Sequence, residues 1–185
     1  MEKTGIFIDG GYLVKALKES FGKSAIDFSK FSALLADGHP VLRTYYYYCM
    51  PYKSKTPTAA ESNRYAKAQK FVDSLESLDR YSVRLGKLAY RGTNADGTPI
   101  LQQKRVDILL ACDLVLLASK QRIGRAVLIT GDSDFIPAIE VAKNEGVEIE
   151  LVYDPAHPPH TALIRIADVR RKLSQEDIDA VKMQR

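Results

Sequence analysis

The sequence predicts an α/β fold: a three-layer sandwich in which helices cover both faces of a central, mainly parallel sheet. Two apolar segments carry this prediction, because each has the character of a buried parallel strand and is followed at once by glycine and carboxylates. They are Ile6-Phe7-Ile8-Asp9 and Val127-Leu128-Ile129-Thr130-Gly131-Asp132-Ser133-Asp134. Strand-like and helix-like segments alternate between them, which is the pattern of right-handed strand–helix–strand crossovers.

The first half of the chain supplies three of the five predicted strands. Gly10-Gly11 turns from the first strand into a helix, and Gly38-His39-Pro40 breaks the chain before the second strand. The elements predicted after the first strand are helices at 13–20 and 28–35, a tyrosine-rich strand at 41–50, a long polar helix at 58–78 and a strand at 81–90. Tyr45 to Tyr48 alternate between the two faces of their strand, so we expect most of them in the core.

The second half of the chain alternates in the same way. Residues 91–99 contain Asn94, Asp96, Gly97 and Pro99, which favour the turn of a hairpin or flap. The remaining predicted elements are a helix at 105–119, a strand at 125–130, a helix at 134–144, a strand at 147–153, and tail helices at 161–166 and 175–183. We therefore expect an α/β domain at 1–154 and a C-terminal helical extension at 155–185 that packs on the same domain.

Acidic side chains are expected to converge at one edge of this sheet. The strands ending at Asp9 and Gly131 are the most apolar, so both should be central, and the strand order 3-2-1-4-5 makes them neighbours. The carboxyl ends of neighbouring strands flank the ligand crevice of an open α/β sheet, so Asp9 and Asp132 should face each other there. Asp107 lies early in the predicted helix at 105–119, which leads into the second of these strands, so its carboxylate can reach the mouth of the same crevice. Asp113 lies on a different helix face, either as a paired core acid or as a supporting residue.

Each of these acids also has a purely structural interpretation. Asp132 or Asp134 can cap a helix, which Pro137 in the first turn supports, and Asp9 can simply end a strand. A helix cap requires only one acid, whereas here Asp132 and Asp134 flank Ser133. Several carboxylates this close together would repel one another strongly, and a divalent cation removes that repulsion. The pattern therefore predicts a site for Mg²⁺ or Mn²⁺ that activates water.

Composition and the remaining motifs narrow the class of protein. Lys and Arg number 27 against 23 Asp and Glu, for a net charge of +4 and a pI near 9.0, which suits either a polyanionic partner or ordinary solubility. Cys49 and Cys112 have no disulfide or metal spacing, so we expect reduced, buried thiols in a cytoplasmic protein. Neither a signal peptide nor a membrane span is predicted. No P-loop is present, and His157 and His160 lie in a proline-rich loop that we expect at the surface.

At these acids the chain resembles the NYN domains, the LabA-like branch of the PIN-like nuclease superfamily. The matching segments are Ile6 to Gly10, Lys104 to Asp107 with Asp113 following, and Thr130 to Phe135. The resemblance extends over about residues 5–153 and implies a PIN-like domain at 1–154. It implies that the acids bind Mg²⁺ or Mn²⁺ and hydrolyse RNA phosphodiesters. Carried over by position, it implicates Asp9, Asp107, Asp132, Asp134 and, as a further candidate, Asp113. Many relatives carry Asn soon after the first Asp, where this chain has Gly10-Gly11-Tyr12.

The leading hypothesis is a metal-dependent endoribonuclease. Asp9 and Asp132 would hold the metal directly, and Asp107 and Asp134 would complete its shell or orient the attacking water. RNA, single-stranded RNA included, would contact a basic rim through its phosphates. The residues of this rim are Lys53, Lys55, Arg91, Lys104 and Arg105. The alternatives are a non-catalytic RNA-binding adaptor and a Toprim-like phosphoryl-transfer domain, although the latter class has Glu at its first acidic position. The sequence leaves the oligomeric state open, a homodimer included.

Overall fold

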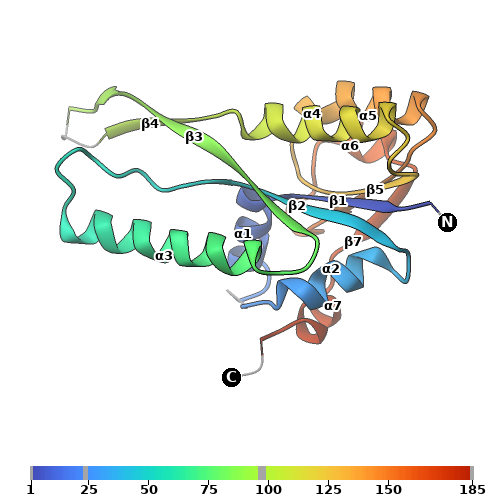
Figure 1. Ribbon diagram of the computed structural model, residues 1–185, viewed down its shortest axis with the longest axis horizontal. Coiled ribbons are helices and arrows are strands. Elements are labelled where there is room, and N and C mark those ends of the chain that lie inside the picture. Colours follow the sequence, from blue (N-terminus) through green and yellow to red (C-terminus); the bar gives the residue numbers. More distant parts are fainter. Residues whose placement is uncertain (1, 23–24, 96–98, 184–185) are drawn as a thin grey trace.

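The computed structural model describes residues 2–22, 25–95 and 99–183, and they form the predicted three-layer α/β sandwich (Figure 1). The sheet has the order β4-β3-β2-β1-β5-β6-β7, and every strand in it is parallel to its neighbours except β4. The five predicted strands correspond to β1, β2, β3, β5 and β6, so the predicted order is confirmed. The strands are β1 (Thr4–Asp9), β2 (Val41–Cys49), β3 (Tyr81–Thr93), β4 (Pro99–Lys104), β5 (Arg125–Ile129), β6 (Glu148–Tyr153) and β7 (Val169–Lys172).

Helices cover both faces of the sheet (Figure 1). On one face lie α4 (Val106–Ser119), α5 (Ile136–Asn144) and α6 (Thr161–Ile166), and on the other α1 (Gly10–Glu19), α2 (Phe28–Ala36), α3 (Ala59–Glu76) and α7 (Gln175–Ala180). Successive residues of β1 point to opposite faces, so Phe7 packs under α4 and α5 while Ile6 and Ile8 pack under α1 and α2. Burial on both faces explains why residues 6–8 of β1 and 126–129 of β5 are all apolar.

The tyrosine run in β2 belongs to the core, as expected. Tyr45, Tyr46 and Tyr47 are buried, with Tyr45 and Tyr47 under α4 and Tyr46 on the opposite face. Phe71 of α3 packs edge-on to Tyr46 at a ring-centroid distance of 5.6 Å. These rings pack β2 beside β1, so that the carboxyl-terminal ends of the two strands lie at the same level.

The predicted flap is an antiparallel hairpin. Strand β3 continues beyond its pairing with β2, which ends at Cys49 and Gly86, and pairs with β4 from Lys87 onward. We call residues 87–95 and 99–104 the hairpin arm; it extends away from the sheet in Figure 1 and leads straight into α4. Two of the turn residues that suggested it, Asp96 and Gly97, lie outside the described residues.

Two expectations were wrong. Strand β7 forms in the tail, where the sequence predicted only helices, because Val169-Arg170-Arg171-Lys172 lacks the apolar alternation on which strand prediction depends. Cys112 is exposed rather than buried: it lies between Ile108 and Leu116 on an apolar stripe of α4 that faces solvent. Cys49 is half-buried. In the part of the chain described here, no helix is both long and apolar enough to cross a membrane.

Candidate functional site

The carboxyl edge of the sheet brings Asp9 and Asp132 together through one hydroxyl group. Strands β1 and β5 are in register up to Ile8 and Ile129, so Asp9 and Thr130 end them at the same level. The Thr130 hydroxyl donates to Asp9 Oδ2 at 3.4 Å and accepts the Asp132 backbone N–H at 3.2 Å. The predicted neighbours β1 and β5 therefore place both acids at one edge.

Asp9 has a structural role and faces the site as well. Its Oδ1 accepts the backbone N–H groups of Gly11 at 2.9 Å and Tyr12 at 3.2 Å, and so caps α1. The helix can begin this close to β2 because residue 10 is glycine: a Cβ there would lie 2.7 Å from the Tyr47 carbonyl oxygen. The cap orients the carboxylate and leaves Oδ2 directed toward Thr130.

Asp132 is likewise a cap, which confirms that one acid of the Asp132–Asp134 pair has this role. Its Oδ1 accepts the Asp134 N–H at 2.9 Å and opens the short 3₁₀ turn η1 (Ser133–Phe135) that runs into α5. Gly131 lets the chain pass the ring of Tyr12, because a Cβ at this position would lie 2.7 Å from that ring. Asp134 is exposed.

The charges of neighbouring acids at this edge affect one another's pKa values. Burial raises the pKa of Asp9 above its ordinary value; the N–H groups of Tyr12 and Gly11 oppose this shift, and the charge of Asp107 adds to it. Desolvation raises the pKa of Asp107 as well, and the charges of Asp132 and Asp134 raise it further. Because these four neighbouring carboxylates repel one another, the carboxyl edge of the sheet favours the binding of a cation.

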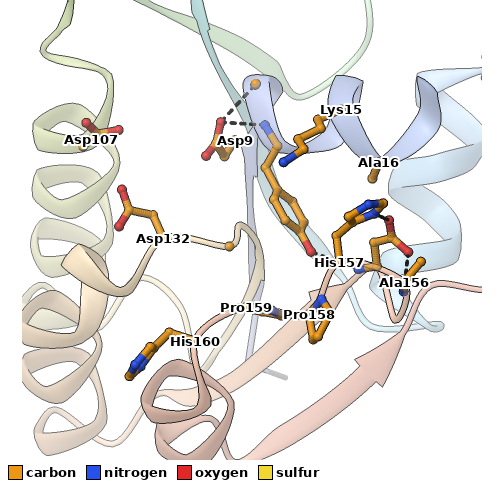
Figure 2. A pocket seen from close by; sticks show the side chains of 14 residues that line it. Asp9, Lys15, Ala16, Asp107, Asp132, Ala156, His157, Pro158, Pro159 and His160 are labelled. Carbon is orange, nitrogen blue, oxygen red and sulfur yellow. Dashed lines mark hydrogen bonds and ion pairs between the residues drawn. The ribbon is translucent and has the colours of Figure 1, made fainter. Parts of the chain in front are cut away.

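A cavity of about 820 Å³ opens at this edge, and Figure 2 shows its lining. Asp107 and Asp132 lie on one side of the cavity, whereas Lys15 and His157 lie on the other, with Asp9 at the end of β1 between them. Asp134 is outside the lining. The lining residues are Asp9, Gly11, Tyr12, Lys15, Ala16, Asp107, Gly131, Asp132, Asp154, Ala156, His157, Pro158, Pro159 and His160.

The second wall of the cavity is a loop that the sequence analysis assigned to the surface. Asp154 follows β6 and its side chain is only 1% exposed. It accepts the Ser20 hydroxyl at 2.5 Å and the Ala156 N–H at 2.9 Å, and its Oδ2 lies 3.0 Å from His157 Nδ1. Burial tends to raise the pKa of Asp154, but the hydrogen bonds from Ser20, His157 and Ala156 lower it below its ordinary value. This carboxylate fixes the loop so that His157 lines the cavity.

His160 is oriented by the helix that it caps. Its Nδ1 accepts the Ala162 N–H at 3.2 Å at the start of α6, so Nδ1 carries no proton and Nε2 does. That N–H is a donor for an anion. Sequence reasoning found neither His160 nor Asp154, although Val152-Tyr153-Asp154 repeats the apolar-strand-then-acid pattern of β1.

Asp113 is a paired acid. Arg84 Nε lies 2.8 Å from its Oδ2, and the Tyr47 hydroxyl donates to the same oxygen at 3.0 Å. Asp113 does not line the cavity. Of the two interpretations that the sequence left open, the structure supports the paired core acid.

The described side chains of the predicted basic rim do not line the cavity. Lys53, Lys55, Arg91 and Arg105 are exposed and none of them lines the cavity. Lys53 lies over the Tyr65 ring at 5.2 Å. The side chain of Lys104 lies outside the described part of the structure. Lys15, in contrast, is a cavity residue that the sequence prediction missed.

No three-ligand metal cluster is assembled here: among residues 2–22, 25–95 and 99–183, no three His, Cys, Asp or Glu side chains come close enough together to hold a metal ion. The donor set is nevertheless one of hard carboxylate oxygens. Mg²⁺ keeps several waters and commonly binds through one or two carboxylates plus substrate phosphates. Asp9 and Asp132 suit that mode of binding.

The α/β fold is that expected of NYN domains, which are PIN-like nuclease domains. The chain belongs to the NYN domain family, whose model matches residues 3–173. That match extends beyond the segment on which the sequence resemblance rested and includes β7.

Two individual proteins are also similar to this chain. The uncharacterized protein y4oD of Sinorhizobium fredii (strain NBRC 101917 / NGR234) is 33% identical over 79 residues, which are 43% of this chain and 33% of the relative. The matched stretch thus spans about a third of that relative's length. A protein of unknown function from Vibrio parahaemolyticus RIMD 2210633, VPA0982, has a crystal structure that aligns with a TM-score of 0.66, at 18% identity over 98% of this chain and 96% of that one. This likeness concerns the fold.

Proposed function

We propose that this protein is a metal-dependent endoribonuclease. The observation that carries the proposal is that Asp9, Asp107 and Asp132 line one cavity at the carboxyl edge, where Thr130 bonds both the Asp9 carboxylate and the Asp132 backbone. Mg²⁺ or Mn²⁺ bound there would lower the pKa of a coordinated water and offset charge on the phosphate. The membership of the NYN family supports a nuclease over a Toprim-like domain.

Each acid has a distinct part in this proposal. Asp9 and Asp132 would hold the cation, because their caps orient both carboxylates before any ligand arrives. Asp107, on the same side of the cavity as Asp132 (Figure 2), would accept a proton from the attacking water, for which its raised pKa is suited. Asp134 is exposed beside this group and would hold an outer water.

Two further lining residues supply donors for the phosphate. Lys15 brings a positive charge and His160 an Nε2–H group, and both line the same cavity as the acids. A phosphodiester in the cavity would have the acids and the cation on one side and Lys15 on the other, whereas His160 lies on the side of Asp132 (Figure 2). The exposed basic rim, Lys53 and Lys55 among its residues, would contact neighbouring phosphates of the RNA.

Cleavage of end-labelled single-stranded RNA tests the proposal. We expect cleavage with Mn²⁺ or Mg²⁺, none with EDTA, and poor support by Ca²⁺. Asp132→Asn should reduce cleavage at least ~100-fold, a loss of ~2.7 kcal/mol in transition-state stabilisation. Asp73→Asn, an exposed acid on α3 outside the cavity, is the matched control and should cleave normally. If the wild type binds RNA but cleaves none under these conditions, the protein is an RNA-binding adaptor.

A further inference from the structure

The hairpin arm carries one exposed tyrosine, Tyr90, which stacks on a half-buried tyrosine outside the arm, and neither ring lines the acidic cavity. The rings of Tyr52, after β2, and Tyr90, in β3, stack with centroids 6.3 Å apart and an interplanar angle of 21°. Tyr52 is half-buried, whereas Tyr90 is 53% exposed. The Tyr90 hydroxyl hydrogen-bonds with the Thr93 hydroxyl in the same arm. The Tyr90 ring is therefore held from one side and from its tip while much of its surface remains in solvent.

The strand register places this pair beyond the catalytic edge. Asp9 is level with Tyr47 of β2, which is level with Arg84 of β3, and Tyr90 follows Arg84 by six residues. At about 3.3 Å per residue, Tyr90 lies roughly 20 Å further along the strand direction than Asp9. Figure 1 shows the arm extending from the sheet on the side where β3 continues beyond β2. A nucleic-acid strand that crosses the acids can thus reach the arm within a few nucleotides.

The two chain segments that carry the rings are cationic in composition. Residues 40–60 and 80–95 together contain seven Lys and Arg and no Asp or Glu, in a chain whose net charge is +4. Arg84 is engaged by Asp113 and Arg80 by the Val41 carbonyl oxygen. The exposed cations nearest in sequence to the two rings are Lys53, Lys55, Lys87 and Arg91. An exposed aromatic ring among cations is complementary to a polyanion that carries its own flat rings.

We propose that the outer face of Tyr90 is a stacking platform for a base of single-stranded nucleic acid, supported from behind by Tyr52. An unpaired base gains from stacking on an aromatic side chain while the nearby cations contact the backbone phosphates. Bases in a duplex are already stacked on both faces, so the platform selects single strands. Its placement relative to the cleaved bond rests on the proposed function; the binding itself does not.

Binding measured without cleavage tests the platform. We would measure affinity by the fluorescence anisotropy of labelled 15-nucleotide single-stranded RNA, single-stranded DNA and an RNA duplex. All titrations would contain EDTA at a fixed salt concentration. Tyr90→Ala should weaken binding to both single strands at least tenfold, equivalent to ~1.4 kcal/mol. Tyr90→Phe, which keeps the ring, should stay within about threefold of wild type. Leu85→Ala removes another exposed apolar side chain of β3, 44% exposed, and should bind as wild type does.

The same experiment can overturn the proposal in three ways. Wild-type affinity in Tyr90→Ala excludes stacking on this ring. Equal losses in Tyr90→Ala, Tyr90→Phe and Leu85→Ala show that these side chains of β3 have only a structural role, and thermal melting of each variant measures that damage. An equal loss on the duplex shows that the ring does not act by stacking on an unpaired base. Tyr90-dependent binding by a protein that cleaves no RNA would leave the platform standing while the nuclease proposal fails.

Discussion

At the residue scale, Asp9 shows that a cap and a candidate catalytic group can be the same side chain. One carboxylate oxygen accepts two N–H groups of α1, and the other reaches Thr130. Burial nevertheless raises its pKa, so the charged form costs folding free energy when no cation is present. The chain retains a carboxylate where an amide would cap the helix equally well.

Asp9→Asn separates these two roles. Asparagine caps helices as well as aspartate does, so the apo protein should melt at the same or a higher temperature, whereas cleavage should fall at least ~100-fold (~2.7 kcal/mol). Asp27→Asn is a matched control, because Asp27 caps α2 through the same pair of bonds, to Ser29 N at 2.9 Å and Lys30 N at 3.1 Å, away from the cavity. Thermal melts and RNA cleavage of both variants would measure the difference; a collapse of folding in Asp9→Asn alone would show a mainly structural carboxylate.

Asp154 should make the stability of the fold depend on pH. Its pKa in the folded state is below its ordinary value of about 3.9, so it stabilises the fold above that pH, and this contribution disappears as pH falls through the lowered pKa. Asp154→Asn should cost about 1–3 kcal/mol at neutral pH, since it disturbs a buried hydrogen-bond network. Urea unfolding of both proteins from pH 7 to pH 2.5 should show the gap closing below pH 4. A gap that stays constant would mean that the carboxylate charge is irrelevant.

At the element scale, the start of α1 shows how closely a helix must approach a neighbouring strand to set the site. Gly10 lies where any Cβ would meet both the Tyr46 ring and the Tyr47 carbonyl oxygen at 2.7 Å. The next residue is different: at Gly11 the nearest atom to an added Cβ is Asp9 Oδ1 at 3.3 Å. Two adjacent glycines therefore have unequal importance.

Gly10→Ala should destabilise the protein by about 1–3 kcal/mol, the usual cost of forcing an extra carbon into a packed contact. Gly11→Ala should be neutral or slightly stabilising, because alanine has the better helix propensity and meets only a side-chain oxygen. Urea midpoints of the two variants give the comparison. Equal destabilisation would contradict the assignment of the close approach to residue 10.

At the scale of the whole molecule, the charge of the arm and the loop after β2 should govern the salt dependence of RNA binding. Removing two phosphate contacts from a complex with a single strand lowers the slope of log K against log salt by about 1.4. The double variant Lys53→Ala/Lys55→Ala should show this change, since both side chains are exposed beside the platform. A double variant at Lys120 and Arg122, in the turn between α4 and β5, should leave the slope unchanged. Anisotropy titrations from 50 to 300 mM salt, about the range in which such slopes are linear, would measure both.

The sequence predicted those parts of the fold and site that depend on local pattern. Asp9 ends one largely apolar strand and Asp132 follows another by three residues, and the order of those strands follows from their burial, so the edge could be found. Lys15 and His160 could not be found, because a lysine on a helix and a histidine in a loop look the same whether they face a cavity or solvent. Asp154 is intermediate: its pattern was present, but its partner Ser20 is 134 residues away in the chain.

Strand β7 has a consequence for how these molecules behave when they are crowded together. An outermost strand offers unpaired backbone groups to any neighbour, and proteins guard against such pairing with short, charged strands. Here the strand is four residues long and three of them are cationic, and Arg170 and Arg171 bond backward to carbonyl oxygens of Ile164 and Leu34. Two copies approaching along this border would bring like charges together. Charge therefore disfavours strand pairing between copies along this border, although the central strands of the sheet are almost wholly apolar.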